Sequence, residues 1–498
     1  MPDDIFGDPL PPNERPARKR QLADHDQRTP DQRIDDILNY PLFYELAELL
    51  PPPSSVGCPR GYPPVTYLLS AAMMTVTGSK RSALGTLSSS QWRSLRAAVR
   101  RHAGRRAAIL LPAHAPSRHQ YLYAENKLLV PSSELLQEHI ENYAVQQALG
   151  QGLFPVDAPR NWARPERRQL LSGDATVPKA PSKAERADDV DTTTGEIRTR
   201  RIDPAARIYY ENGEERKTIV RGTKWFFASA RDDGYWRRVI LTVQHVAGGE
   251  YEGEAAVAVR SFLRLQAQLP GAMGVVYDGA FRGVHRDFLA RRKLLVINKQ
   301  HGSVKPRAYE LLRPGRCRHD LWCHEGRIAE RVPLDDGTTY LLPVPVTRLE
   351  HREGVHKSRW YHLLNIACRH GPHLHRVSVG ITSTPSDRAQ YDPDTGKRLP
   401  SDTERDFHRA EYLQQIPEAT LAHQLVYPYR SDAESLHSQL DQSMWNRRMI
   451  SYGLERQKIF MLGFVLAQNA TSQRLYFARR ASDNQPAGRG RNQNLMSL

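Results

Sequence analysis

Hydrophobic residues change their spacing near residue 165, and this change constrains the fold more than any other feature of the 498-residue sequence. Between residues 33 and 155 apolar residues recur at helical spacing, whereas from residue 170 onward they form short runs typical of strands. A polar loop is expected from about residue 179 to 203. The order predicts an α/β domain that follows an all-helical module. We predict strands at residues 170–177, 223–230, 237–246, 274–277 and 294–298, and helices at 254–269 and 285–292.

Two aspartates stand where predicted strands end. Asp174 follows Gly173 at the end of the first strand, and Asp278 comes directly after the fourth strand, before Gly279. Aspartate beside glycine is common in turns, so either residue alone is weak evidence of chemistry. The pair becomes a candidate site only if the two strands are neighbours in the sheet.

A third acidic residue begins a predicted C-terminal helix within residues 425–449. Ser431 precedes Glu434 by three residues, a capping-box pattern in which both side chains satisfy exposed backbone amides. On this pattern alone, Glu434 either caps the helix or takes part in chemistry. Tyr427 and Arg430 precede it, and the spacing between Tyr427, Arg430 and Glu434 is more specific than the cap.

This spacing resembles the Tyr-Arg-Glu-Lys signature of cut-and-paste DDE transposases encoded by bacterial insertion sequences. Three of the four signature positions match, and Asp441 stands where the family has lysine. The resemblance implies a ribonuclease H-like catalytic core, whose strand and helix order agrees with the predicted order. In that fold the first and fourth strands are central neighbours, and the helix with the glutamate crosses their ends. Asp174, Asp278 and Glu434 would then be the catalytic and metal-binding residues.

Three carboxylates packed together repel one another, so the expected cofactor is Mg²⁺ or Mn²⁺, with two ions bound. The implied reaction is hydrolysis of a DNA phosphodiester followed by strand transfer. Arg430 lies one helical turn before Glu434 and is expected to hold a DNA phosphate. Tyr427 either stacks on a displaced base or caps the same phosphate, and the alternative is a partly buried tyrosine.

The helical module carries a basic helix. Trp92, Leu95 and Val99 form its apolar stripe, and the serines at 88–90 are expected to cap it after a turn. The opposite face is basic, which predicts contact with double-stranded DNA; the alternative is a solvated basic face. The arginines predicted to bind DNA are Arg93, Arg96, Arg100 and Arg101.

Composition agrees with a polyanionic partner. Lysine and arginine number 71 against 55 acidic residues, which gives a formal charge of +16. We expect no signal peptide and no membrane span, and the four cysteines are too few for a disulfide scaffold. The expected location is the cytoplasm, at the nucleoid, with a homodimer assembled on DNA. No Gly-rich phosphate loop or Ser-His-Asp pattern supports nucleotide hydrolysis or acyl transfer.

Residues 301–420 alternate in short runs and predict a β-rich domain inserted between the second aspartate and the glutamate. This region holds a group of cysteines and histidines whose spacing matches no standard zinc knuckle. We therefore favour scattered histidines over a zinc site. The group comprises Cys317, His319, Cys323, His324, Cys368, His370, His373 and His375.

The predicted organisation has six parts, and two functions remain open. One is an active metal-dependent transposase, and the other is a transposase-derived DNA-binding protein that keeps the fold without the reaction. Asp441 is the feature that divides them. The parts are a disordered tail (1–32), a helical DNA-binding module (33–155), the first part of the core (165–300), the inserted domain (301–420), the C-terminal core helices (421–480) and a second disordered tail (481–498).

Overall fold

The computed structural model describes most of the chain. Residues outside the description are 1–3, 12–13, 15–27, 53–60, 185–187, 191–192, 200, 213–216, 235–236, 249–252, 355–357, 388, 390, 393–394 and 484–498. Most of the two predicted tails falls on these residues. The last helix, α14 (Leu454–Asp483), extends to the end of the described part of the chain.

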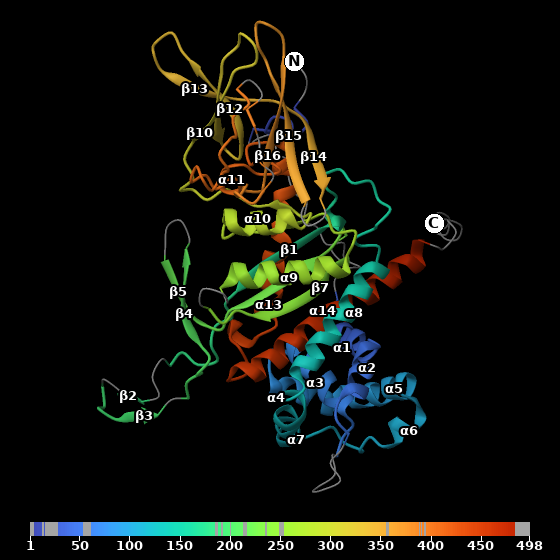
Figure 1. Cartoon of the computed structure of the whole chain (residues 1–498). Coiled ribbons are helices and arrows are strands. Elements are labelled where there is room, and N and C mark those ends of the chain that lie inside the picture. Colours follow the sequence, from blue (N-terminus) through green and yellow to red (C-terminus); the bar gives the residue numbers. More distant parts are fainter. Residues whose placement is uncertain are drawn as a thin grey trace, which may run out of the picture.

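A five-stranded sheet forms the centre of the molecule, in the order β7-β6-β1-β8-β9 (Figure 1). β1 pairs with β6 in antiparallel register and with β8 in parallel register, and β9 continues the parallel part. All five predicted strands are confirmed, and the first and fourth are neighbours at the centre. The strands are β1 (Leu170–Thr176), β6 (Trp225–Ala230), β7 (Val239–His245), β8 (Gly274–Val276) and β9 (Leu295–Ile297).

Helices cover both faces of this sheet. Successive side chains along a strand point to opposite faces, so neighbouring residues of one strand contact helices on opposite sides. Phe226 of β6 packs edge to face on Phe262 of α9 (Glu254–Gln268), with ring centroids 5.7 Å apart. The next residue, Phe227, packs on Phe464 of α14 from the opposite face, at 6.1 Å. α13 (Ser431–Gln442) also packs against β1 and β6. Gly173 lies under α9, where a Cβ would come within 2.6 Å of the Phe262 ring, so close packing explains this glycine.

The helical module is continuous with the core. One hydrophobic cluster includes Leu69 of α3, Trp225 of β6 and Phe464 of α14. α14 passes so close to α3 that a Cβ on Gly463 would lie 2.8 Å from a backbone oxygen of α3. The module therefore shares its core with the C-terminal helix. Its helices are α1 (Pro30–Leu38), α2 (Leu42–Leu49), α3 (Pro64–Thr77), α4 (Lys80–Thr86), α5 (Trp92–His102), α6 (Gly104–Ile109), α7 (Arg118–Ala124) and α8 (Ser133–Gly150).

The expected serine cap before α5 is wrong. Residues Leu87–Gln91 form a π-helical segment that joins α4 to α5, and α5 has no side-chain cap. Ser90 instead donates its hydroxyl to the Thr86 carbonyl, 3.2 Å away. Because backbone bonding continues through the segment, the turn expected between two helices does not form there.

Two hairpins occupy the region where we predicted a polar loop and no strand before residue 223. β2 (Asp188–Val190) pairs with β3 (Ile197–Thr199), and β4 (Arg207–Asn212) pairs with β5 (Lys217–Gly222). Figure 1 shows both projecting from the side of the sheet. Apolar residues such as Ile197, Ile208 and Ile219 are exposed on them. Val220 and Gly222 are buried positions on β5, but most other described positions of the two hairpins are exposed or half-buried, so the strands lack the apolar–polar alternation on which the prediction relied.

The inserted domain is β-rich, as predicted, and consists of a four-stranded sheet and a three-stranded sheet. Trp360 anchors the second sheet to α10 (Gly283–Arg291) by donating its indole N–H to the Ala290 carbonyl, 2.9 Å away. Short helices α11 (Arg409–Tyr412) and α12 (Leu421–Val426) lead back to the core. The strands are β10 (Arg307–Leu312), β11 (His319–His324), β12 (Arg327–Pro333), β13 (Thr339–Pro343), β14 (Val346–Glu353), β15 (Ser358–Ile366) and β16 (His373–Val379).

The prediction of a disordered tail at 1–32 is wrong for residues 28–32, where Thr29 caps the start of α1, and for residues 4–11. Phe6 is fully buried and packs against His362, with ring centroids 5.3 Å apart. Asp4 forms an ion pair with Arg327, and the Leu10 amide donates to the Gln424 side chain. A single aromatic anchor within a charged segment left no periodic signal to recognise.

Among the helices that are described, none combines the length and the apolar character needed to cross a bilayer.

Candidate active site

The ends of two central strands bring two predicted residues together. Asp174 lies near the carboxyl end of β1, and Asp278 lies two residues beyond the end of the parallel strand β8. Adjacent parallel strands end at the same sheet edge, which is where α/β sheets commonly bind ligands. One carboxylate oxygen each from Asp174, Asp278 and Glu254 can be chosen so that all three lie within 4.8 Å of one another. We call these three residues the carboxylate cluster.

Glu254 is the member that sequence reasoning missed. It is the first residue of α9, and an acidic residue at a helix start has the ordinary interpretation of complementing the helix dipole. The Tyr277 hydroxyl donates to its Oε1 at 2.8 Å, and Lys224 Nζ lies 2.5 Å from its Oε2. These two partners hold the carboxylate toward the strand ends. Only the packing of α9 against the sheet could reveal this position.

The cluster has unfavourable electrostatics. Burial raises the pKa of Asp174 to about 7; the positive charge of Arg430 opposes the rise, and the charges of Asp278 and Glu254 add to it. Burial also raises the pKa of Asp278, against a hydrogen bond from the Ala280 amide and with the charge of Glu254. Perturbed carboxylates of this kind concentrate at functional sites, because a bound cation or substrate relieves the repulsion.

Arg430 lies between Asp174 and Glu434. Its Nη1 donates to Glu434 Oε1 at 2.7 Å, and its Nη2 lies 3.4 Å from Asp174 Oδ2. Glu434 is not part of the carboxylate cluster, and its side chain is 55% exposed. The structure therefore brings together two of the three predicted metal ligands and connects the third through a guanidinium group.

The capping-box interpretation of Glu434 is wrong. α13 begins directly after a 3₁₀ turn, Tyr427–Arg430, and has no side-chain hydrogen bond at its N-cap. Glu434 pairs instead with the arginine one turn earlier. Its position on α13, beside β1, leaves it next to the strand end that carries Asp174.

The donor set suits a hard divalent cation. All three cluster residues offer carboxylate oxygens, the ligands that Mg²⁺ and Mn²⁺ prefer. Lys224 pairs with Glu254 and Arg430 pairs with Asp174, so these two cations offset part of the negative charge of the cluster. A cation bound there would replace part of their positive charge, and Arg430 would then be free to meet another anion.

His437 helps to hold α13 against the strand that carries Asp174. It lies on α13 one turn beyond Glu434, and burial lowers its pKa to about 4, against a hydrogen bond with the backbone of Asp174. Its ring tilts against Phe227, with centroids 6.3 Å apart. A neutral imidazole in this position packs α13 against β1 without adding charge.

Tyr427 and Asp441 lie on either side of Glu434 in the sequence and have different surroundings. Tyr427 is half-buried and stacks on His423, with ring centroids 5.0 Å apart and planes 12° from parallel. His423 covers one face of the Tyr427 ring, in agreement with the alternative of a partly buried tyrosine. Contact of Tyr427 with DNA stays a prediction. Burial raises the pKa of Asp441, and the charges of Arg447 and Lys179 oppose that rise. The cations that act on Asp441 are therefore Arg447 and Lys179 rather than Arg430.

The basic helix has the predicted amphipathic form. Trp92, Leu95 and Val99 are buried on α5, and the arginine face is exposed. Figure 1 places α5 at the end of the molecule opposite the inserted domain. Contact with DNA stays a prediction for this face. The exposed arginines are Arg93, Arg96, Arg100 and Arg101, of which Arg101 donates to the Asn39 side chain.

Comparisons with known proteins do not place this chain in a family. No family model matches it, and neither the curated proteins nor the solved structures give a match. Any functional assignment therefore depends on the residues and their geometry.

Proposed function

We propose that this chain is a DNA transposase with a ribonuclease H-like core, which cleaves the ends of a mobile element and joins them to target DNA. The observation that carries the proposal is the convergence of Asp174 and Asp278 at the ends of the two central parallel strands. The sheet order β7-β6-β1-β8-β9 supports the same fold. The spacing of Tyr427, Arg430 and Glu434 adds independent support from sequence.

The carboxylate cluster would bind Mg²⁺ or Mn²⁺. Two such ions, when bound, stabilise both the attacking and the departing oxygen of a phosphodiester. Asp174 and Asp278 supply rigid ligands because their strands are central, and Tyr277 and Lys224 orient Glu254. Glu434 becomes available as a further ligand once Arg430 releases it and pairs with a DNA phosphate.

Basic surfaces account for the DNA partner. A formal charge of +16 favours association with a polyanion, and the exposed arginines of α5 offer phosphate contacts at a distance from the cluster. A long duplex can contact the arginines of α5 while it is cleaved at the carboxylate cluster. We propose double-stranded DNA as the substrate, a homodimer as the assembly on DNA, and the nucleoid of the cytoplasm as the location.

One observation favours a second candidate, a transposase-derived DNA-binding protein without catalysis. Lys224 and Arg430 pair with cluster carboxylates, so protein cations already offset part of the negative charge. Asp441 also replaces the lysine of the family signature. In this alternative the carboxylates keep their places in the fold but take part in no reaction, and DNA binding is the only function.

A plasmid nicking assay with the full chain separates the two. Wild-type protein with Mg²⁺ should nick supercoiled DNA, and Asp278→Asn should bind DNA normally without nicking it. Glu455→Gln, at an exposed position on α14, is the matched control and should nick normally. DNA binding without nicking by the wild type, in Mg²⁺ and in Mn²⁺, would favour the second candidate.

A further inference from the structure

Two hairpins of the inserted domain bring four soft metal ligands together. β10 pairs with β11 through Leu312 and His319, so Cys317 lies in the connecting turn. β15 pairs with β16 through Ile366 and His373, so Cys368 lies in the second turn. Each hairpin thus contributes a cysteine from its turn and the histidine that begins its second strand.

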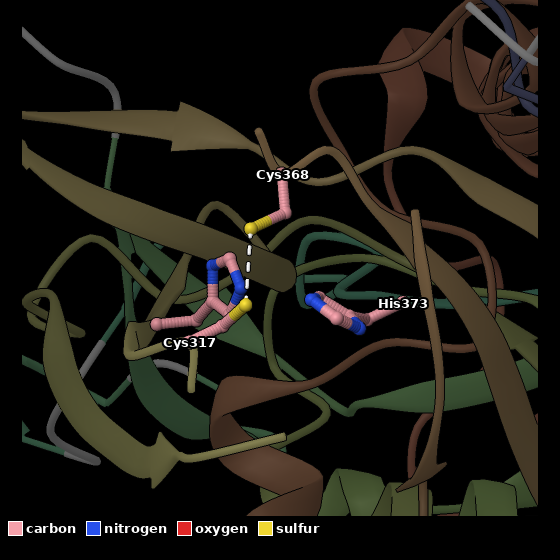
Figure 2. A group of neighbouring side chains, drawn as sticks. Cys317, Cys368 and His373 are labelled. Atoms are coloured by element: carbon pink, nitrogen blue, oxygen red, sulfur yellow. Dashed lines mark hydrogen bonds between the residues drawn. The ribbon is translucent and has the colours of Figure 1, made fainter. Parts of the chain in front are cut away.

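The ligand atoms of these four residues lie within 4.8 Å of one another. The Sγ atoms of Cys317 and Cys368 are 3.4 Å apart, and the rings of His319 and His373 have centroids 5.3 Å apart. Figure 2 shows the two sulfur atoms pointing toward each other, with the His373 ring beside them. At Zn–S distances of about 2.3 Å, tetrahedral geometry places two sulfurs about 3.8 Å apart. The expectation of scattered residues is therefore wrong for these four.

The histidines provide a second, independent observation. His319 is buried, and its Nδ1 lies 2.7 Å from Glu330 Oε1, which leaves Nε2 for another partner. Nε2 of His319 and Nε2 of His373 are both buried and lack a hydrogen-bond partner. A carboxylate on the far nitrogen is the usual way in which proteins orient a metal-binding histidine. Two unpartnered nitrogens beside two thiols are therefore the donor set of a cation-binding site.

We propose that Cys317, His319, Cys368 and His373 bind one Zn²⁺ ion as a structural site. Four protein ligands of the Cys₂His₂ type leave no open position for substrate, which is typical of structural zinc. The ion would join the four-stranded sheet to the three-stranded sheet of the inserted domain. This site is separate from the carboxylate cluster, and its test does not depend on DNA cleavage.

Two neighbouring groups define the alternatives. The 3.4 Å separation of the sulfurs also permits a disulfide after a small movement, which would consume both thiols. His370 Nδ1 lies 3.1 Å from Cys317 Sγ, but His370 is exposed. We assign the fourth ligand to His373, whose Nε2 is buried and without a partner.

Metal analysis of the full chain tests the assignment. Protein purified with reductant and without chelator should contain one zinc ion per chain, measured by inductively coupled plasma mass spectrometry. The Cys317→Ser/Cys368→Ser double variant should lose it, and His373→Ala should lose most of it. Cys323→Ser, at a buried thiol on the same strand as His319, is the matched control and should keep its zinc. His370→Ala should also keep it.

Cobalt substitution guards against variants that fail to fold. Wild-type chain loaded with Co²⁺ should show thiolate-to-cobalt charge transfer and the intense visible bands of tetrahedral coordination. Reduced wild-type protein without stoichiometric zinc and without these bands would overturn the proposal, as would a Cys317–Cys368 disulfide in the native chain. Zinc lost in His370→Ala but kept in His373→Ala would overturn the ligand set.

Discussion

Replacing Asp174 with asparagine should stabilise the protein at alkaline pH, because this carboxylate is costly in the absence of a cation. Its pKa is about 7 in the folded chain against an ordinary value of 3.8, chiefly because it is buried. The folded state therefore binds the proton more tightly than the unfolded state. Stability falls as the pH rises from about 4 to about 7, and the full penalty remains above pH 7.

The size of the effect follows from that shift. At about 1.4 kcal/mol per pKa unit, a rise of about three units costs roughly 4 kcal/mol above pH 7. The amide oxygen of the Asp174→Asn variant can still accept the hydrogen bond from the Ala175 amide, but the variant loses the ion pair with Arg430, 3.4 Å away. The guanidinium left without this carboxylate reduces the gain, so we expect about 1–3 kcal/mol at pH 8 and about 1 kcal/mol or less at pH 5.

Urea denaturation of metal-free protein, followed by tryptophan fluorescence at pH 5 and pH 8, measures the gain. Trp225 is buried on β6, two strands from β8, and reports on the central sheet. Asp335→Asn, at an exposed turn of the inserted domain, is the control and should change neither midpoint by a comparable amount. An equal effect of Asp174→Asn at both pH values would refute the assigned pKa.

Three further predictions concern DNA. Glu434→Gln should bind DNA normally but lose Mg²⁺-dependent nicking, as Glu254→Gln should; normal nicking by either variant would exclude that residue from the reaction. Alanine at all four basic positions of α5 should weaken binding by the full chain and reduce its salt dependence, measured by gel shift at several salt concentrations; unchanged binding would place recognition elsewhere. Asp441→Lys should tighten binding to a cleaved end and make it more salt-sensitive, with Asp441→Ala intermediate; loss of nicking in both variants with binding unchanged would assign Asp441 to catalytic geometry. The α5 positions are Arg93, Arg96, Arg100 and Arg101.

The central sheet was predictable because its strands are buried and bounded by clear turns. β6 and β8 are largely apolar runs, and β1 begins with two buried leucines. That the aspartates at the ends of β1 and β8 lie side by side was expected only from the resemblance to a family with a ribonuclease H-like core. The hairpin of β4 and β5 is largely exposed where it is described, with Val220 and Gly222 as buried positions, so its residues carry little pattern that separates a strand from a loop.

The candidate site was predictable only in part, for a related reason. Glu254 stands at a helix start, where an acidic residue is ordinary, and its place in the cluster depends on how α9 packs. Ser431 and Glu434 have the spacing of a capping box, but Glu434 accepts a hydrogen bond from Arg430 instead. The ligands of the proposed zinc site come from two hairpins, so their distance depends on how two sheets meet.

Direct measurement of Mn²⁺ binding is the sharpest test of the carboxylate cluster. Free Mn²⁺ is measured by electron paramagnetic resonance as metal-free full chain is titrated. Tight binding by the wild type should weaken strongly in Asp278→Asn and in Asp174→Asn, and binding should fall as the pH drops below about 7, because Asp174 then holds a proton. Mn²⁺ binding that is equal in the wild type and both variants would contradict a metal site at the ends of β1 and β8.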